Sequence, residues 1–407
     1  MSGKEGPMSN KEINRRRFLK AGALGLAGAP LLQSCGGGNG GTEPESETAS
    51  AGAEAPRIVR YNTLGRTGLE VSDISLGGAT EEPVLRYALD RGINLYDTAE
   101  QYHAGEHERH IGKAFKGALR DKAVVITKHV HGLSAPITRE NVIERFDASL
   151  ERLGFDDVDI AMLHHVADPA IFGNEELLSA YDTLKQQGKF RFLGFSTHDA
   201  EKVIPGAIDS GMFDVMLMIY NSIQYPERSD LITRAHDAGI GVMAMKTMAG
   251  RQQDRVAELV NEKTSFSQAA ITWALSDPGV DSVLISIRTF EHVDEYCAAS
   301  GRTLTAADKA VLATYETAVN NQFCRIGCTT CQASCPEQVA VGDIMRFGMY
   351  FENYGNEKQA ILEYASLDER NRAAACLTCR SGTCERACPH NLAIRERLVR
   401  YDGMLRV

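Results

Sequence analysis

The chain lacks the sequence patterns of several common cofactor and partner classes. It contains no CxxCH, which argues against a covalently attached haem, and no flavin fingerprint. No GxGxxG follows the first predicted strand, which disfavours an open dinucleotide-binding sheet. The body of the chain has no block of basic residues and the net charge is −10, so we expect no nucleic-acid partner.

Cysteine, in contrast, is concentrated near the C-terminal end. Of the ten cysteines, eight fall in the last quarter of the chain, in two runs that each end in Cys-Pro. The first run is Cys324, Cys328, Cys331 and Cys335, and the second is Cys376, Cys379, Cys384 and Cys388. Four closely spaced thiolates followed by a proline match the ligand pattern of a cubane cluster, so we expect two [4Fe-4S] clusters.

Two alternatives for these cysteines stay open, namely two structural zinc sites or four disulfides in an exported protein. The ferredoxin pattern has two residues in each of its first two gaps. Here the first run has three residues in its first gap and the second has four in its second gap, which leaves the cluster type open. In two-cluster ferredoxins the fourth cysteine of each run ligates the other cluster. By that rule Cys388 joins the first run's cluster and Cys335 joins the second run's.

The N-terminal segment resembles a twin-arginine export signal with a lipoprotein cleavage site. Residues 14–20 read Asn-Arg-Arg-Arg-Phe-Leu-Lys, and a stretch of small apolar residues, too short for a good membrane span, runs from Ala21 to Leu32. Leu32-Gln33-Ser34-Cys35 follows, which would place a lipid on Cys35. The alternative is a disordered basic tail. We therefore expect export to the periplasm or cell envelope, with the membrane contacted only through the signal or lipid anchor at residues 1–35.

The middle of the chain alternates strand-like and helix-like patterns. Residues 36–56 contain no bulky apolar residue and are expected to form a flexible linker. The predicted strands are Val71–Leu76, Ile93–Tyr96, Ala123–Thr127, Val158–Leu163, Phe190–Phe195, Val215–Tyr220, Gly241–Met245 and Ser282–Ile285. Amphipathic stretches such as Arg139–Leu153, Glu175–Gln187 and Ser267–Leu275 lie between them. Eight such units predict a (β/α)8 TIM barrel over residues 57–300, of the α/β class.

Two further segments frame this barrel. Arg60–Leu64 and Leu69–Val71 flank a Gly-Arg-Thr-Gly turn and predict a hairpin that plugs the barrel bottom. Residues 301–407 carry both cysteine runs, with helices expected at Val341–Tyr354 and Lys358–Ala375. This part is expected to be a small all-helical ferredoxin-like domain.

Four titratable residues follow consecutive strands of the predicted barrel. Asp97 and Tyr102 follow the second strand, Lys128 ends the third and His164 ends the fourth. Each has an ordinary explanation as a helix cap or surface charge. Because active sites of these barrels assemble at the C-terminal ends of the strands, we expect the four to converge there.

These residues resemble the aldo/keto reductase family. The resemblance rests on Tyr96-Asp97-Thr98-Ala99 with Tyr102, Ile111-Gly112-Lys113-Ala114, Ile126-Thr127-Lys128 and Leu163-His164, and it runs from about Tyr61 to Tyr296. With the cysteine runs and Gly241–Lys246 added, the chain is similar to the iron–sulfur branch of that family. The resemblance implies Tyr102 as proton donor, with Lys128 lowering the tyrosine's pKa. Asp97 would hold Lys128, and His164 would orient a carbonyl.

The implied cofactor site is less complete. At the positions where the family grips and stacks on nicotinamide, this chain has Ser196-Thr197, Leu217 and Met245, of which only Ser196 is typical. Ser286, Arg288 and His292 match the region that binds the adenosine phosphate, and Arg288 would suit NADP(H) as a bidentate donor.

Two hypotheses follow. The first is an exported reductase that interconverts a small carbonyl compound and its alcohol with NADP(H), while two clusters serve a redox partner protein. The second is an iron–sulfur electron-transfer protein for an external partner, in which the barrel is non-catalytic and acts as a docking scaffold. A nicotinamide transfers two electrons at once, whereas each cluster accepts one. How electrons would pass between a nicotinamide in the barrel and the clusters therefore stays open.

Overall fold

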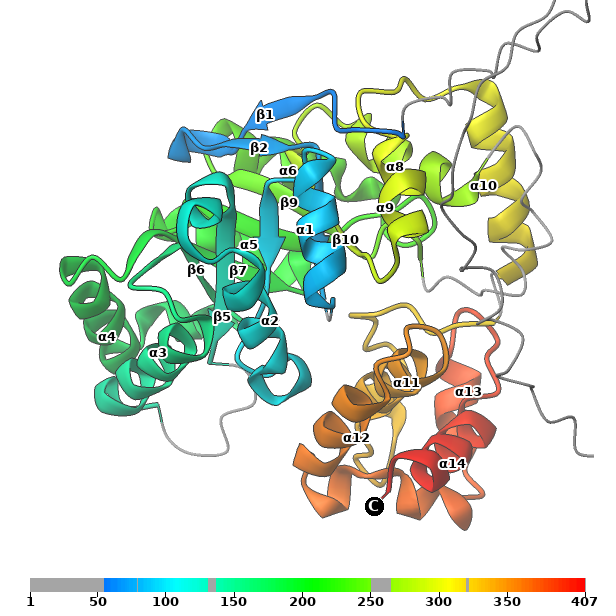
Figure 1. The fold of residues 1–407 in the computed structure, drawn as a ribbon. Coiled ribbons are helices and arrows are strands. Elements are labelled where there is room, and N and C mark those ends of the chain that lie inside the picture. The colour runs from blue at the N-terminus through cyan, green and yellow to red at the C-terminus, as the bar shows by residue number, and fades with distance from the viewer. Residues whose placement is uncertain (1–54, 79, 131–136, 250–264, 320–321, 407) are drawn as a thin grey trace, which may run out of the picture. The chain divides into compact units, whose positions relative to one another are not determined.

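The computed structural model describes residues 55–78, 80–130, 137–249, 265–319 and 322–406 (Figure 1). All of them belong to one compact unit, Glu54–Val407. The expected signal segment with Cys35, and nearly all of the expected linker, lie outside the described residues. No described helix combines the length and the apolar composition needed to cross a membrane.

Eight parallel strands close into a barrel, in the order β10-β3-β4-β5-β6-β7-β8-β9 (Figure 1). They are β3 (Ile74–Gly77), β4 (Leu95–Asp97), β5 (Val124–His129), β6 (Val158–Leu163), β7 (Phe190–Thr197), β8 (Val215–Ile219), β9 (Gly241–Met245) and β10 (Ser282–Ser286). The predicted TIM-type barrel is therefore confirmed, and β6 and β9 have the predicted bounds.

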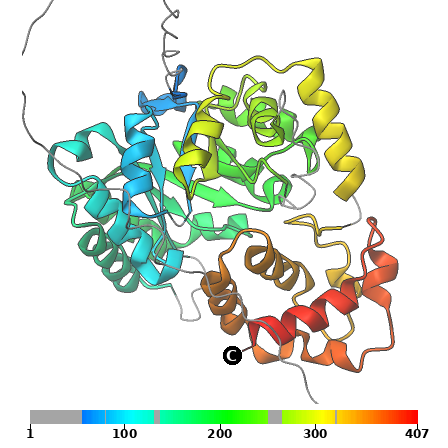
Figure 2. The ribbon, with the colours of Figure 1, turned by 45° about the vertical axis from the view of Figure 1, so that its right-hand side comes forward.

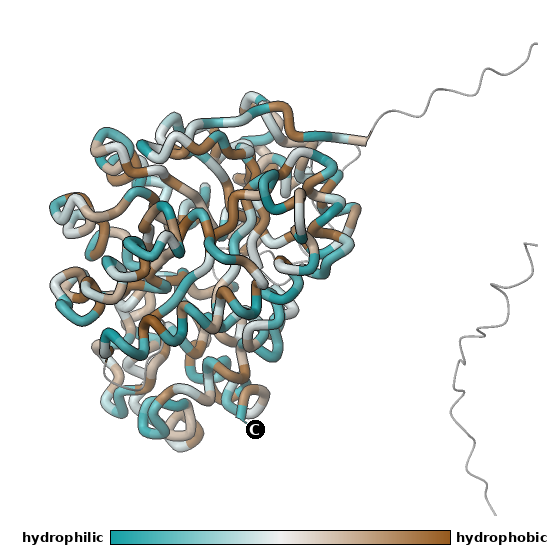
Figure 3. Tube along the Cα trace, turned by 60° about the vertical axis from the view of Figure 1, so that its left-hand side comes forward, coloured by the Kyte–Doolittle hydropathy of each residue, from teal (hydrophilic) through white to brown (hydrophobic). Residues whose placement is uncertain are grey.

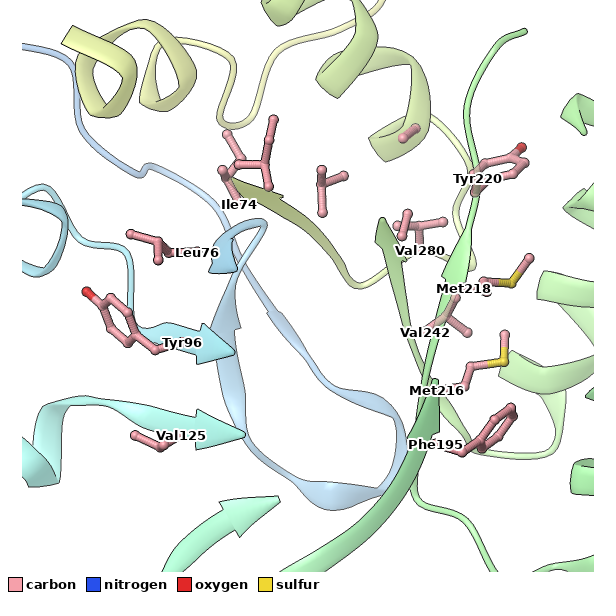
Figure 4. Packing of buried hydrophobic residues seen from close by; sticks show 14 of the residues in the cluster. Ile74, Leu76, Tyr96, Val125, Phe195, Met216, Met218, Tyr220, Val242 and Val280 are labelled. Atoms are coloured by element: carbon pink, nitrogen blue, oxygen red, sulfur yellow. The ribbon is translucent and has the colours of Figure 1, made fainter. Parts of the chain in front are cut away.

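The two faces of each strand pack into two different cores because successive side chains of a strand point in opposite directions. Residues facing the helices include Leu76, Val125 and Met216, and Figure 4 shows several of them packed around the strands. The barrel interior holds a separate cluster that includes Leu95, Ile126 and others. This is the layered filling expected of a barrel that encloses side chains and not a pore.

A hairpin of β1 (Tyr61–Thr63) and β2 (Glu70–Ser72) precedes the barrel, as predicted. Leu64 and Val71 belong to the interior cluster, so the hairpin closes one end of the barrel. The predicted strand Val71–Leu76 is wrong in one respect, because it is two strands separated at Asp73. The Asp73 carboxylate accepts hydrogen bonds from Ser300 Oγ (2.8 Å) and from the backbone N–H of residue 301 (2.9 Å), which fixes this break.

Helices surround the barrel. In Figure 3, hydrophilic and hydrophobic residues alternate along these helices. They are α1 (Glu82–Asp90), α2 (Glu106–Ala114), α3 (Arg139–Leu153), α4 (Glu175–Gln186), α5 (Ala200–Ser210), α6 (Ser229–Asp237), α8 (Phe266–Leu275), α9 (Phe290–Cys297) and α10 (Ala306–Val319). The bounds predicted for α3 are confirmed, and a capping box between Thr138 and Asn141 explains where it begins. α10 packs on α8 and shares the barrel's outer core.

The C-terminal part is helical (Figure 2). Its buried apolar residues form a cluster that also includes Ile219 of β8. It contains α11 (Val341–Glu352), α12 (Glu357–Ser366), α13 (Thr383–Ala387) and α14 (Ile394–Leu405). The predicted helix Lys358–Ala375 is wrong beyond Ser366. Arg372 donates hydrogen bonds to the carbonyls of Ala365 (2.6 Å) and Leu367 (3.2 Å), which turns the chain at that point.

Candidate active site

The four predicted catalytic residues lie together at the C-terminal ends of neighbouring strands. Asp97 is the last residue of β4, Lys128 lies in β5, and His164 directly follows β6. Tyr102 begins the short 3-10 turn that follows β4. Neighbouring parallel strands thus bring together residues up to 67 positions apart.

The Lys128 ammonium is the centre of this group. It lies 2.6 Å from Asp97 Oδ2 and donates hydrogen bonds to the Thr98 carbonyl (2.7 Å) and to Tyr102 Oη (3.3 Å). Lys128 and Asp97 are almost completely buried. A buried ammonium with three oxygen partners has all its donors used, so its position is fixed.

Burial controls the protonation of these groups. It raises the pKa of Asp97 and lowers that of Lys128, and in each case the partner's charge opposes the shift. Burial, followed by Asp97 and Tyr350, raises the pKa of Tyr102 well above its ordinary value. Desolvation and the negative Asp97 thus decide the net direction, and the pKa-lowering contribution expected of Lys128 stays a prediction. Tyr102 keeps its proton at neutral pH.

A small cavity of about 50 Å³, cavity B, brings the reacting groups to one space. Tyr102, Lys128 and His164 line it. The Tyr102 and His164 rings stand edge to face, with centroids 5.7 Å apart. A carbonyl oxygen in cavity B would therefore lie beside both a phenol and an imidazole.

A larger cavity of about 390 Å³, cavity A, adjoins the same residues. Ser286, Arg288 and His292, predicted to bind the adenosine phosphate, all line it, together with Asp97 and Tyr102. The Thr247 hydroxyl also lines it and is buried without a hydrogen-bond partner among the described residues. An unpaired buried hydroxyl and a guanidinium in a cavity of this size fit a phosphorylated nucleotide.

Arg288 is already engaged by the C-terminal part of the chain. Its guanidinium donates to the Gly355 carbonyl (3.2 Å) and to Asn356 Oδ1, and burial lowers its pKa. A 2′-phosphate would therefore bind an arginine whose position is set by the segment between α11 and α12.

The two predicted nicotinamide contacts differ from each other. Ser196 lines cavity B, where its hydroxyl accepts a hydrogen bond from the His165 backbone N–H (2.8 Å). Thr197 is buried and donates its hydroxyl to the Val166 carbonyl (2.7 Å), so it supports the loop after β6. Thr197 lines neither cavity A nor cavity B.

Two cavity residues were absent from the sequence prediction. Lys246 follows β9 with a positive φ of 57°, a conformation that is uncommon outside glycine and often marks functional sites. Its ammonium lies 3.0 Å from Tyr350 Oη of α11. Both residues line cavities A and B. The C-terminal part therefore contributes to the walls of the site.

The eight C-terminal cysteines form no disulfide, and they gather in two groups. Burial, with the neighbouring thiols of Cys331, Cys328 and Cys388, raises the pKa of Cys324 to about 12. Cys376 is raised to about 12 by burial, with Cys335, Cys379 and Cys384 as its neighbours. Cys335, Cys376, Cys379 and Cys384 also line one small cavity. Each group therefore takes one cysteine from the other run.

The spacing of these thiols bears on the metal they could hold. Within the described part of the chain, no three His, Cys, Asp or Glu side chains converge as a single-ion site would require. In a cubane cluster each of the four cysteine sulfurs binds a different iron atom, whereas in a zinc site all four bind one ion. The sulfur ligands of a cluster therefore lie farther apart than those of a zinc ion. Four thiols in each group are the donor set that such a cluster requires.

Comparisons with known proteins concern the barrel. Residues 77–258 match the model of the aldo/keto reductase family. A Schizosaccharomyces pombe protein named as a voltage-gated potassium channel subunit beta is 28% identical over 305 residues, covering 59% of this chain and 88% of that protein. Versiconal hemiacetal acetate reductase from Aspergillus parasiticus is 25% identical over 330 residues, covering 61% of this chain and 94% of the reductase.

A solved structure supports the same fold. A Pseudomonas aeruginosa protein assigned to the aldo-keto reductases superposes with a TM-score of 0.51 at 24% identity, covering 61% of this chain and 96% of that protein. The family match thus places an aldo/keto reductase family domain at residues 77–258, and Asp97, Tyr102, Lys128 and His164 lie at the ends of its strands. A reductase is among the proteins to which this domain is similar.

Proposed function

We propose that this protein is an exported aldo/keto reductase that reduces a small carbonyl compound, or oxidises the alcohol, with NADP(H). The observation that carries the proposal is the Lys128 ammonium held between Asp97 and Tyr102 on the wall of a cavity that His164 shares. A general acid must reach the reacting oxygen and be in the right protonation state. Tyr102 meets both requirements.

Each residue has a separate part in the reduction. NADPH, when bound, supplies the hydride, and Ser286, Arg288 and Thr247 would hold its phosphates in cavity A. Tyr102 donates its proton to the carbonyl oxygen, and His164 orients that oxygen. Lys128 stabilises the negative charge that develops on Tyr102 as the proton leaves.

Replacing Tyr102 by Phe tests this assignment. We expect the kcat for NADPH-dependent reduction to fall by about 10²- to 10⁴-fold, the usual contribution of a general acid. Because the pKa of Tyr102 is raised, the wild-type rate should stay level through neutral pH and decline only above the ordinary range of tyrosine. Tyr181→Phe is the matched control, since the buried Tyr181 hydroxyl has no partner in the described structure. Equal activity of both variants would reject the assignment.

For the cysteines we propose two [4Fe-4S] clusters with crossed ligands. One would be held by Cys324, Cys328, Cys331 and Cys388, and the other by Cys335, Cys376, Cys379 and Cys384. Support comes from the two thiol groups, each of which includes one cysteine of the other run. We propose that the clusters exchange single electrons with a redox partner protein.

Export by the twin-arginine route is part of the same proposal. The basic, apolar and small-plus-Cys segments occur in the order such a signal requires, with Cys35 as the lipid-bearing residue. This route carries folded proteins and so suits a protein that receives clusters before export. Anchoring at the cell envelope is tested by membrane fractionation of wild type and Cys35→Ala. Equal release of both from the membrane would contradict it.

A second candidate is an electron-transfer protein with a degenerate barrel. Leu217 and Met245 stand in the cavity walls where the family resemblance implies an amide and an aromatic ring for nicotinamide. The relative named as a channel subunit is similar to this chain, and its name describes no reductase. An anaerobic optical titration with NADPH separates the two. Bleaching of both the nicotinamide band and the cluster band supports the reductase. A cluster band that NADPH leaves unchanged supports the electron-transfer protein, whose clusters receive no electrons from the barrel.

A further inference from the structure

A second tyrosine–lysine pair lies opposite the catalytic one. Lys246 Nζ is 3.0 Å from Tyr350 Oη and 4.8 Å from the centroid of the Tyr350 ring. The Arg346 guanidinium lies 5.4 Å from the same ring. Lys246 follows β9 of the barrel, whereas Tyr350 and Arg346 belong to α11, so the pair joins two parts of the chain.

The two pairs share the space that a substrate must occupy. Tyr102, Lys246 and Tyr350 all line both cavity A and cavity B. Lys128 and His164 line cavity B from the barrel side, and Arg346 and Glu363 line it from the C-terminal side. A molecule whose carbonyl reaches Tyr102 therefore lies against Tyr350 as well.

The two tyrosines differ in their electrostatic environments. Burial would raise the pKa of Tyr350, but Lys246 and Arg346 together outweigh it and lower that pKa, against the opposing charge of Glu363. Burial raises the pKa of Tyr102, and Tyr350 is one of the groups that add to this shift. Neighbouring titratable groups with opposite shifts mark a division of roles in an active site.

We propose that Tyr350 is a specificity-determining residue that binds a hydroxyl group next to the carbonyl of the substrate, so that the preferred substrates are hydroxy-aldehydes or hydroxy-ketones. This inference rests on the proposed reductase function. Tyr350 Oη accepts a hydrogen bond from Lys246 and also interacts with the Arg346 guanidinium, so its own O–H, or a remaining lone pair when it is ionised, is what a ligand can bind. A hydroxyl suits it because a hydroxyl can both donate and accept, whichever protonation state Tyr350 has.

The test compares two aldehydes that differ by their hydroxyl groups, glyceraldehyde and propanal, with the full-length protein. In Tyr350→Phe we expect kcat/KM for glyceraldehyde to fall about tenfold, as the loss of one strong hydrogen bond predicts. Because Tyr350 also contributes to the raised pKa of Tyr102, the decisive quantity is the ratio of kcat/KM for glyceraldehyde to that for propanal, which should fall about tenfold. Tyr401→Phe is the matched control, because Tyr401 bonds Glu352 and lines neither cavity A nor cavity B. Equal losses for both aldehydes, or none for either, would overturn the inference.

A second measurement separates this inference from the proposed function. The ultraviolet absorbance of tyrosinate, followed against pH, should show one tyrosine that ionises below the ordinary range and disappears in Tyr350→Phe. In Lys246→Gln that ionisation should move to higher pH. Glyceraldehyde should shift it and propanal should not, even if neither aldehyde is turned over, in which case only the proposed reductase function would fail. No shift with glyceraldehyde would overturn the role of Tyr350.

Discussion

At the scale of single residues, the buried pair of Asp97 and Lys128 is the most consequential interaction of the site. Both side chains are removed from water, and each depends on the other for charge compensation. Removing one partner of such a pair leaves an uncompensated buried charge, which typically costs about 3–5 kcal/mol. The pair therefore links the stability of the barrel to its chemistry.

Lys128→Met should accordingly lower the free energy of unfolding by about 3 kcal/mol at neutral pH and abolish reduction. The pKa of Asp97 is already raised by burial and should rise further without the ammonium. Because the carboxyl group is then protonated more easily in the folded protein than in the unfolded chain, the loss of stability should shrink as the pH falls. Urea unfolding at several pH values measures this.

The double variant Lys128→Met with Asp97→Asn is the control for this prediction. It removes both charges, so most of the lost stability should return while activity stays absent. A double variant as unstable as the single one would show that packing, and not the unpaired carboxylate, causes the loss.

The sequence was sufficient to predict the residues contributed by strand ends. Asp97, Tyr102, Lys128 and His164 follow consecutive strands, and barrel topology alone brings them together. The pKa direction of Tyr102 was not predictable, because it depends on how completely Tyr102 is desolvated. Tyr350 was missed for a related reason. It lies 248 positions from Tyr102 in the sequence, and only tertiary packing of α11 places it in the site.

At the scale of elements, the periodicity of apolar residues predicted the bounds of those strands and helices whose limits follow from their own local sequence. The bounds of β6, β9 and α3 follow from local apolar patterns and, for α3, from its capping box. The errors lie where a tertiary contact overrides a local pattern. The Asp73 hydrogen bonds divide one predicted strand, and the Arg372 hydrogen bonds follow the end of α12 at Ser366.

Two glycines in helix interiors give a paired prediction. A Cβ atom at Gly112 of α2 would lie 1.9 Å from the Leu153 carbonyl oxygen of α3, whereas nothing lies within 4 Å at Gly403 of α14. Gly403→Ala should therefore stabilise the protein by about 0.5–1 kcal/mol. Gly112→Ala should destabilise it by about 1–3 kcal/mol, because α2 must move away from α3.

Chemical denaturation of the two variants and the wild type measures this difference. The comparison isolates the close helix contact, since both replacements add one methyl group to a helix. A Gly112→Ala protein as stable as Gly403→Ala would mean that α2 shifts without cost.

At the scale of the whole unit Glu54–Val407, side-chain contacts tie the cysteine-bearing part to the barrel. Tyr225 donates a hydrogen bond to the Ile326 carbonyl (3.1 Å), between the first two cysteines of the first run. A Cβ atom at Gly327 would lie 2.4 Å from the His198 carbonyl oxygen, so only glycine allows this approach. Cys328 and Cys324 also contribute to the raised pKa of Tyr225. The first thiol group therefore lies against the barrel.

The crossed ligation of the two proposed clusters gives a prediction at the same scale. Cys388→Ala should remove a ligand from the cluster of Cys324, Cys328 and Cys331, and Cys335→Ala should remove one from the cluster of Cys376, Cys379 and Cys384. The double variants Cys324→Ala with Cys328→Ala, and Cys376→Ala with Cys379→Ala, provide reference spectra for the loss of each cluster. Electron paramagnetic resonance of the reduced proteins, with iron content, makes the comparison.

We expect the Cys388→Ala spectrum to match the first reference and the Cys335→Ala spectrum to match the second. Cys297→Ala is the control, since Cys297 is a buried free thiol of α9 outside both runs. The opposite matches would mean that each run holds its own cluster and that the two thiol groups rearrange when iron binds. The arrangement matters for function, because crossed ligands tie both clusters into one apolar core. Loss of either cluster should then loosen α11 and the position of Tyr350 in the active site.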